Sequence, residues 1–269
     1  MTVTERLPHF DNPPLDRVVL GAAYDPLPRL RAVHLGLFWS TLGQDAFPSV
    51  QEMNGHPVSP EEFPARREAP DFDLSFVDRP ALPRVVWTHK DGNLEIALQA
   101  DRLQVAWQRG EEPYPRFEYA RDFFVHYFQM WREFVHAQGL GEIRTRQAEV
   151  SYFNTLARGM GWTDIGGLAG VVHVAQPAAT RGGDLEEYHY SDSYALSQDP
   201  HRGRLRLTLF SGRSAADAHD AAMTLTVKGP TNDEDLLDYL NFGHEAIVSA
   251  FLDATSQAAQ EMWGRRRPV

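Results

Sequence analysis

The chain has 269 residues, a net charge of −11 and no cysteine. The missing cysteines exclude disulfides, thiolate metal sites and cysteine nucleophiles. The negative charge argues against a nucleic-acid partner, because non-specific binding depends on neutralising phosphates with Lys and Arg. The chain has no apolar stretch of membrane-spanning length, and its N-terminus lacks a basic region followed by an apolar core. We therefore expect a cytoplasmic protein without a membrane association.

The first half of the chain is predicted to contain a strand, a helix and a three-strand meander. Arg17–Tyr24 is apolar and predicts a strand, and the spacing of apolar residues predicts a helix from Leu30 to about Ala46. Seven prolines in residues 48–83 predict an irregular connection across the surface, with a short strand near Phe72–Phe76. Three strands around an Asp-Gly turn follow, at Arg84–His89, Leu94–Gln99 and Leu103–Trp107.

The strongest helical pattern of the chain runs from Phe117 to Phe134. Eight of the thirty aromatic residues fall in these eighteen positions. At about 100° per residue they occupy one half of a helix, and most of the other half is charged or polar. Such a broad apolar face must lie on another apolar surface, most naturally a sheet, so we expect this helix to anchor the fold. The eight residues are Phe117, Tyr119, Phe123, Phe124, Tyr127, Phe128, Trp131 and Phe134.

The second half of the chain repeats this order of elements. Arg146–Phe153 alternates between apolar and polar residues and predicts a strand. A glycine-rich region, residues 159–170, stands where the first half has its short helix. Three strands are predicted at Glu187–Leu196, Leu205–Phe210 and Ala222–Val227. A final helix is predicted from about Asp233 to Trp263.

Each half therefore has the same predicted order of elements: a strand, a helix or loop, three strands and a long helix. This repeated order indicates an internal duplication. The predicted fold class is α+β: a curved antiparallel sheet of about eight strands with two long helices on its concave face. Saddle-like and helix-grip folds have this shape. The halves, residues 1–141 and 142–269, form either one continuous domain or two separate α+β domains.

Short motifs without a catalytic signature are spread over most of the chain. They include Pro13-Pro14-Leu15, residues 34–39 (HLGLFW), 114–118 (YPRFE), 139–143 (GLGEI), 244–248 (HEAIV) and 263–266 (WGRR). As a set, these motifs resemble those of a sporadically distributed family of uncharacterised bacterial proteins. The patchy distribution of that family implies accessory operons for defence, toxin–antitoxin systems or specialised biosynthesis. The resemblance thus implies an accessory or regulatory partner of a protein from the same operon.

Known catalytic and cofactor-binding motifs are missing from the sequence. It has no dinucleotide fingerprint, Walker loop, nucleophile elbow or His-Glu-x-x-His zinc motif, so no catalytic residue, cofactor or resident metal is predicted. Asp217, His219 and Asp220 could hold a metal ion in a hairpin loop. The simpler interpretation is that these three residues are solvated, because no second motif supports a metal site.

His244 is the histidine with the most informative surroundings. Its position places it on the apolar flank of the last helix, beside Gly243, which permits close approach of another element. It is either a core imidazole with a single partner or the polar group of a ligand cavity between the helices and the sheet. In the cavity hypothesis, Tyr127, Trp131 and Phe251 also contact the ligand.

Two other groups of residues are candidates for a protein interface. Alternation places Tyr188, Tyr190 and Tyr194 on one face of a strand, and Asp192 among them indicates that this face is not wholly buried. Tyrosine is enriched at interfaces. The basic C-terminal cluster, which includes Arg265 and Arg266, either complements the dipole of the last helix or meets a partner.

The leading hypothesis from the sequence is a non-enzymatic interaction protein that binds a protein partner, and a homodimer is compatible with it. The alternative is a small-ligand-binding protein or enzyme that uses the cavity near His244.

Overall fold

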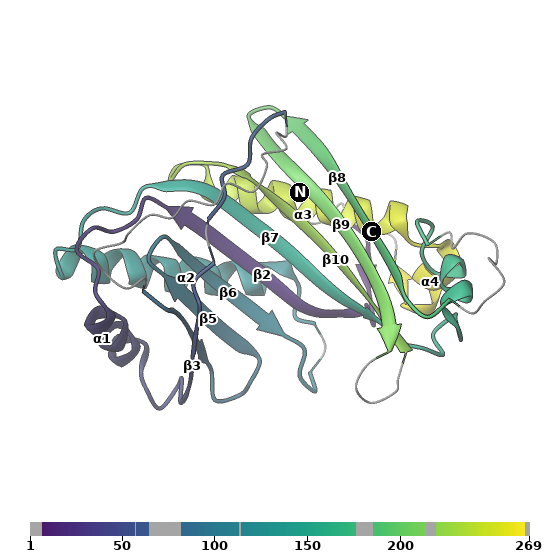
Figure 1. The fold of residues 1–269 in the computed structure, drawn as a ribbon, viewed down its shortest axis with the longest axis horizontal. Coiled ribbons are helices and arrows are strands. Elements are labelled where there is room, and N and C mark those ends of the chain that lie inside the picture. The colour runs from purple at the N-terminus through teal and green to yellow at the C-terminus, as the bar shows by residue number, and fades with distance from the viewer. Residues whose placement is uncertain are drawn as a thin grey trace.

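The computed structural model describes residues 7–56, 58–64, 82–112, 114–175, 185–213 and 219–266. Within these residues, nine strands form one antiparallel sheet in the order β3-β4-β5-β6-β2-β7-β10-β9-β8 (Figure 1). The prediction of an α+β fold with a large antiparallel sheet is confirmed. The predicted strand near Phe72–Phe76 lies outside the described residues.

The first half of the sheet follows the predicted strands, with one addition at its edge. The unpredicted strand is β3 (Ser49–Met53), and the prediction of an irregular connection over residues 48–83 is wrong at these five residues. All residues of β3 are exposed, so no alternating apolar pattern marks it. The helix α1 (Ala32–Leu42) is shorter than predicted because the chain leaves it at Gly43, at φ 89°. The strands are β2 (Leu15–Tyr24), β3 (Ser49–Met53), β4 (Arg84–Thr88), β5 (Leu94–Gln99) and β6 (Arg102–Gln108).

The second half of the sheet continues from the first without a break. The central strands β2 and β7 pair antiparallel along most of their length. Outward from this pair, the strands run β6-β5-β4 on one side and β10-β9-β8 on the other. The glycine-rich region contributes a short 3₁₀ helix, η2 (Ile165–Gly170). The strands are β7 (Thr145–Leu156), β8 (Tyr188–Gln198), β9 (His201–Arg213) and β10 (His219–Pro230).

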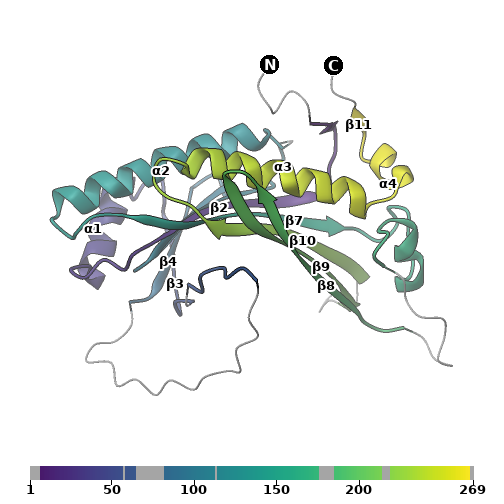
Figure 2. The same cartoon turned by 90° about the horizontal axis from the view of Figure 1, so that it is seen from above.

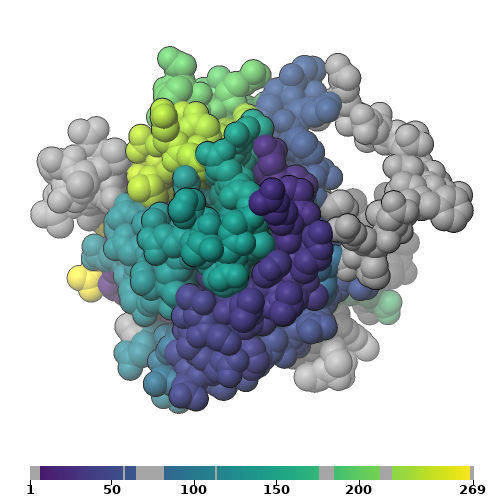
Figure 3. All heavy atoms as spheres, turned by 90° about the vertical axis from the view of Figure 1, so that its left-hand side faces the viewer, coloured from purple at the N-terminus to yellow at the C-terminus, as the bar shows by residue number. Residues whose placement is uncertain are grey.

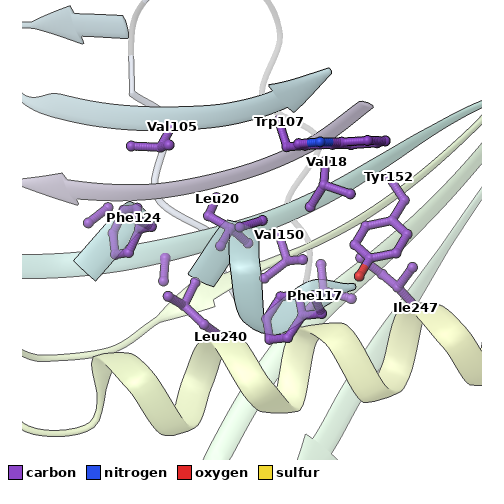
Figure 4. Packing of buried hydrophobic residues seen from close by; sticks show 14 of the residues in the cluster. Val18, Leu20, Val105, Trp107, Phe117, Phe124, Val150, Tyr152, Leu240 and Ile247 are labelled. Carbon is purple, nitrogen blue, oxygen red and sulfur yellow. The ribbon is translucent and has the colours of Figure 1, made fainter. Parts of the chain in front are cut away.

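The long helices α2 (Phe117–Ala137) and α3 (Leu236–Ala254) lie on the same face of this sheet (Figure 2). Helix α2 packs on β6 and β2, and α3 packs on β7, β10 and β9. Most of the aromatic face of α2 is buried there, although Tyr119 remains 39% exposed. Figure 4 shows Phe117 and Phe124 from α2 among apolar side chains of the sheet and α3. Among the described residues, no helix has the length and apolarity needed to cross a membrane.

Helix α3 approaches the sheet closely at Gly243. A Cβ atom at this position would lie 2.8 Å from Val150 Cγ2 on β7, nearer than side chains pack. Glycine therefore allows α3 to pack directly against the central strand β7, next to His244.

The prediction of one continuous final helix is wrong, because α3 ends at Ala254. Thr255 has extended backbone angles (φ −112°, ψ 146°) and pairs with Val172 as an isolated bridge. The hydroxyl of Ser256 then accepts a hydrogen bond from the backbone of Ala259 and starts α4 (Gln257–Met262). After α4 the chain forms β11 (Arg265–Arg266), which pairs with β1 (His9–Phe10) and brings the two chain ends together (Figure 2).

Part of the proline-rich connection, residues 54–56 and 58–64, crosses the face of the sheet opposite the helices (Figure 1). Its main anchor is Glu61, whose backbone N–H donates to Gln147 Oε1 at 2.9 Å. The Glu61 carboxylate binds Arg204 at 2.8 Å and Arg206 at 2.6 Å. Burial acts to raise the pKa of Glu61, but the hydrogen bonds from Arg206 and Arg204 outweigh it and hold the pKa below its ordinary value.

The end of the molecule that carries α1 is closed by an aromatic cluster. Phe38 on α1 meets the rings of Trp87, Trp131 and Phe134 with centroid distances of 5.8, 4.9 and 5.3 Å. Figure 3 shows this end, where α1, the end of α2 and the chain entering α3 form one surface. An ion pair between Arg132 and Asp233, with 2.9 Å between the charged atoms, joins α2 to the chain before α3.

Candidate functional site

A cavity of about 200 Å³ lies between the start of α2, the middle of α3 and the central strand β7, beneath the N-terminal segment. An engineered cavity of about 150 Å³ holds benzene, so this volume accommodates a single ring with a small substituent. Figure 4 shows Phe117, Tyr152 and Ile247 converging in the space between the sheet and α3. The lining is mostly apolar and includes Leu7, Pro8, Phe10, Leu15, Tyr114, Phe117, Tyr152, Asn154, His244, Ile247, Val248 and Phe251.

His244 is the central polar side chain of this cavity. It is only 9% exposed, and its ring stacks on Phe117 with 4.1 Å between centroids and 3° between planes. Its Nδ1 lies 2.7 Å from the Tyr152 hydroxyl, which in turn lies 3.4 Å from the Tyr114 hydroxyl. The partner of His244 is therefore a phenol, Tyr152, which lies between His244 and Tyr114 in a short series of hydrogen-bonded groups.

The three titratable side chains of this hydrogen-bonded series, His244, Tyr152 and Tyr114, are uncharged at neutral pH. Burial, reinforced by repulsion from Arg121, lowers the pKa of His244 from 6.5 to about 3. Burial also raises the pKa of Tyr152 well above its ordinary value, and it raises the pKa of Tyr114 in the same direction. The site therefore offers hydrogen bonds but no charge of its own at its centre.

The hydrogen bond between Tyr152 and His244 fits two positions of its proton. At 2.7 Å, either the phenol donates to Nδ1 or the imidazole N–H donates to the phenol oxygen. Because the imidazole is neutral, Nε2 is a donor in the first arrangement and an acceptor in the second, and in both it can form one hydrogen bond with a ligand.

Two polar atoms at the cavity have no partner in the described part of the chain. One is His244 Nε2. The other is Oδ1 of Asn154, a residue that is 5% exposed. Its Nδ2 donates to the Met223 carbonyl at 3.1 Å, and since a carbonyl can only accept, the orientation of the amide is fixed. Neither atom is among the fully buried atoms that lack a partner in the described residues, so both are accessible from the cavity, where a ligand can form hydrogen bonds with them.

Charged side chains lie at the edge of the cavity. Arg116 is exposed and Glu118 is half-buried, and both line the cavity at the start of α2. Arg116 has φ 81°, and it is the one non-glycine residue with a positive φ in the described ranges. Such strained backbone is found preferentially at functional sites. The two opposite charges offset each other at the edge.

The N-terminal segment covers the cavity, and the C-terminal strand β11 pairs with this segment. Phe10 of β1 meets the Phe251 ring edge-on, with 5.6 Å between centroids. Arg266 of β11 holds the N-terminal segment through Asp11, with 2.9 Å from Nε to Oδ2. Arg265 donates to Gln260 Oε1 of α4. Arg265 and Arg266 are the two arginines predicted as interface residues. The structure instead places them in contacts with α4 and with the N-terminal segment.

Only some of the predicted ligand residues lie together. His244 and Phe251 line the cavity, whereas Tyr127 and Trp131 lie further along α2. Trp131 is about 21 Å from Phe117 along the helix axis, at 1.5 Å per residue, and its Nε1 donates to the Tyr24 hydroxyl at 2.9 Å. Tyr127 packs against Phe47, with 5.7 Å between ring centroids. These two residues belong to the core of the first half.

Sequence reasoning missed Tyr114, Tyr152 and Asn154 as site residues. The alternation of β7 shows only that Tyr152 and Asn154 share a face with Val150. Nothing in that pattern indicates that His244, ninety-two positions further on, would sit above them.

The predicted tyrosine strand is β8, at the edge of the sheet. Its register pairs Tyr190 with Leu209 and Tyr194 with Leu205, so these tyrosines face the same side of the sheet as the helices. The hydroxyls of Tyr190 and Tyr194 both donate to Asp192, from Tyr194 at 2.6 Å. Tyr188 donates to the Val174 carbonyl at 2.8 Å.

No group of three or more His, Asp or Glu side chains within the described ranges is arranged to hold a metal ion. Of the residues considered for a metal, Asp217 lies outside those ranges.

Neither a protein-family model nor a curated protein sequence matches this chain. Function is therefore inferred from the geometry and chemistry of the cavity.

Proposed function

We propose that this chain is a binding protein for a small molecule that occupies the cavity between α2, α3 and β7. The observation that carries the proposal is a pair of polar atoms without a protein partner, His244 Nε2 and Asn154 Oδ1, which belong to largely buried residues of a cavity with a mostly apolar lining. Ligand sites commonly combine apolar walls with a few convergent polar groups.

The electrostatics of the site favour binding over catalysis. A general base works best with a pKa near the working pH, and the pKa of His244 is lowered to about 3. The raised pKa values of Tyr114 and Tyr152 keep both phenols protonated, so neither supplies a phenolate nucleophile. The polar groups of the cavity are suited to orienting a ligand.

Native mass spectrometry of the protein purified from its own host tests this proposal. We expect a non-covalent adduct of low mass that is released on denaturation. The variant Val248→Phe should lose the adduct, because Val248 lines the cavity and a phenyl ring would fill part of it. The matched control is Val125→Phe on the exposed side of α2, which should retain it. Absence of an adduct from the wild type, or its retention in Val248→Phe, would contradict the proposal.

A second proposal is the interaction role inferred from the sequence, with β8 as the contact. This eleven-residue edge strand has no fully buried residue, and its outer edge has no strand partner among the described residues. Exposed edges can pair with a strand of another chain. The alternating tyrosines and serines also resemble the composition of adaptable binding surfaces. These observations support a protein partner, and the resemblance of the motifs implies that this partner is encoded in the same operon.

Co-purification with the product of the neighbouring gene tests the interaction role. Lysines at Ser191 and Ser193 should abolish the complex, because charges on an edge strand oppose strand addition. The control is Gln51→Lys on β3, the opposite edge of the sheet. If the wild-type chain remains alone and monomeric in this assay, the interaction role is wrong.

We further propose that the two halves arose by duplication, that the chain belongs to the sporadically distributed bacterial family that its motifs resemble, and that it works in the cytoplasm. The matching strand order on either side of the β2–β7 pair supports the duplication. Superposition of β2 to α2 on β7 to α3 tests it, and a different path of the two halves would refute it.

A further inference from the structure

A second hollow, of about 240 Å³, lies on the face of the sheet opposite the long helices, which is turned toward the viewer in Figure 1. Successive residues of a strand face opposite sides of a sheet. Tyr152 of β7 lines the cavity beside His244, whereas its neighbour Phe153 lines this hollow. The sheet therefore separates the two spaces. Small side chains line the hollow together with four charged ones, which are Arg17, Arg84, Glu95 and Glu149.

Two arginines on neighbouring strands lie close together at this hollow. Arg102 of β6 is the register partner of Gln99 on β5, and it faces the side of Gln104, which lines the hollow two residues further on. The register of β4 against β5 places Arg84 on the other side of Gln99. With about 4.8 Å between neighbouring strands, the two arginine Cα atoms are about 10 Å apart. Both side chains are partly buried, and at this spacing they can meet a single group between them.

Neither of these two guanidinium groups has a hydrogen bond or an ion pair within the part of the chain that the structure describes. The carboxylates around them interact with other groups. Glu95 forms an ion pair with Arg17 at 2.5 Å, and Asp101 accepts a hydrogen bond from Gln99 Nε2 at 2.6 Å. Glu149 accepts a hydrogen bond at 3.2 Å from the hydroxyl of the serine two positions further on. The two arginines are therefore cations without a counter-ion among the described residues.

The electrostatic surroundings of Arg84 are repulsive on balance. Burial lowers the pKa of Arg84, and repulsion from Arg102 and Arg17 lowers it further. This repulsion exceeds the attraction of the two carboxylates that line the hollow. A partly buried cation without a counter-ion is unfavourable for folding, and an anion placed between Arg84 and Arg102 would offset the repulsion.

We propose that this hollow is a second binding site, which takes a small molecule with an anionic group, a carboxylate or a phosphate, between Arg84 and Arg102. Guanidinium groups bind both kinds of oxyanion through paired N–H donors. The rest of the ligand lies over the small side chains of Ala97 and Ala106, toward the exposed ring of Phe153. The site is independent of the function proposed for the cavity, because it lies on the other face of the sheet.

Calorimetric titration at constant ionic strength with two probes, inorganic phosphate and succinate, tests this assignment. We expect the wild type to bind at least one of them, and the tighter of the two identifies the anionic group. Arg84→Gln and Arg102→Gln should each weaken this binding about tenfold, because each removes charged hydrogen bonds to the anion. The matched control is Arg144→Gln, which removes an exposed arginine that is paired with Glu142 and should leave the binding unchanged.

The unfolding of the variants in urea separates lost binding from lost folding. Because the surroundings of Arg84 are repulsive in the free protein, Arg84→Gln should unfold at the same urea concentration as the wild type or a higher one. If Arg84→Gln fails to fold, the titration of Arg102→Gln decides the question. Failure of both probes to bind the wild type, or equal binding by the wild type and the two arginine variants, would overturn the proposal. Neither result affects an adduct in the cavity beside His244.

Discussion

Protonation of His244 should link the stability of the protein to pH. The imidazole is buried against Phe117, bonded to Tyr152 and repelled by Arg121, and its pKa in the folded protein is lowered to about 3. In the unfolded chain it is hydrated, with an ordinary pKa of 6.5. Below pH 6.5, His244 binds a proton in the unfolded state but not in the folded state. The stability due to neutral His244 is therefore complete above pH 6.5 and is lost progressively as the pH falls toward 3.

The size of this effect at moderate acidity follows from the unfolded-state pKa. At about pH 5 the unfolded histidine is protonated, 1.5 pH units below its pKa, while the folded one remains neutral. At about 1.4 kcal/mol per unit, His244 alone lowers the free energy of unfolding by about 2 kcal/mol relative to pH 7.5.

Urea unfolding of the wild type and of His244→Gln at about pH 7.5 and pH 5 measures this contribution. Glutamine cannot titrate but retains polar atoms that can meet Tyr152. All other titrating groups are common to both proteins, so the wild type should lose about 2 kcal/mol more than the variant between the two pH values. Parallel losses, within about 0.5 kcal/mol, would refute the burial of a neutral imidazole at this site.

Three further substitutions test the packing and the polar contacts by urea unfolding. Gly243→Ala places a methyl group 2.8 Å from Val150 Cγ2 and should destabilise the protein by about 1–3 kcal/mol. The control Gly36→Ala, with no atom within 4 Å of the new methyl group, should be neutral or stabilising. Equal effects of the two substitutions would show that α3 can move away from the sheet. Tyr152→Phe leaves Nδ1 of the buried histidine without its partner and should cost about 1–3 kcal/mol, and an unchanged midpoint would show that this hydrogen bond contributes nothing. Glu61→Gln removes the carboxylate of a buried ion pair and should cost about 3 kcal/mol. Because the pKa of Glu61 is lowered, the wild type should lose this advantage as the pH falls through the acid range, and an advantage that persists there would contradict the pairing.

Much of the sheet and both long helices could be predicted because their side chains follow clear periods. The aromatic face of α2 has the helical period over more than four turns, and β7 alternates along most of its length. By contrast, β3 has five exposed residues, so no buried face imposes a pattern on its sequence. The break after Ala254 is decided by the bridge between Thr255 and Val172, a contact between distant segments that local periodicity cannot indicate.

Only part of the candidate site could be predicted from the sequence, for a similar reason. His244 and Phe251 lie on the apolar side of one helix, so their burial could be predicted. Tyr127 and Trp131 are predicted as ligand contacts because they lie on the aromatic face of this helix, but the helix extends that face over a distance much longer than a small cavity. Asn154 became recognisable only from the register of β7 against its neighbours.

The central claim is that a small molecule can occupy the cavity beside His244. A crystal of the protein soaked in benzamide tests it most directly, through the difference density between Phe117, Ile247 and Phe251. We predict density for one ring in this space, with a polar group within hydrogen-bond distance of His244 Nε2 or Asn154 Oδ1. A cavity filled by the protein's own side chains, with no density for the ligand, would contradict the claim.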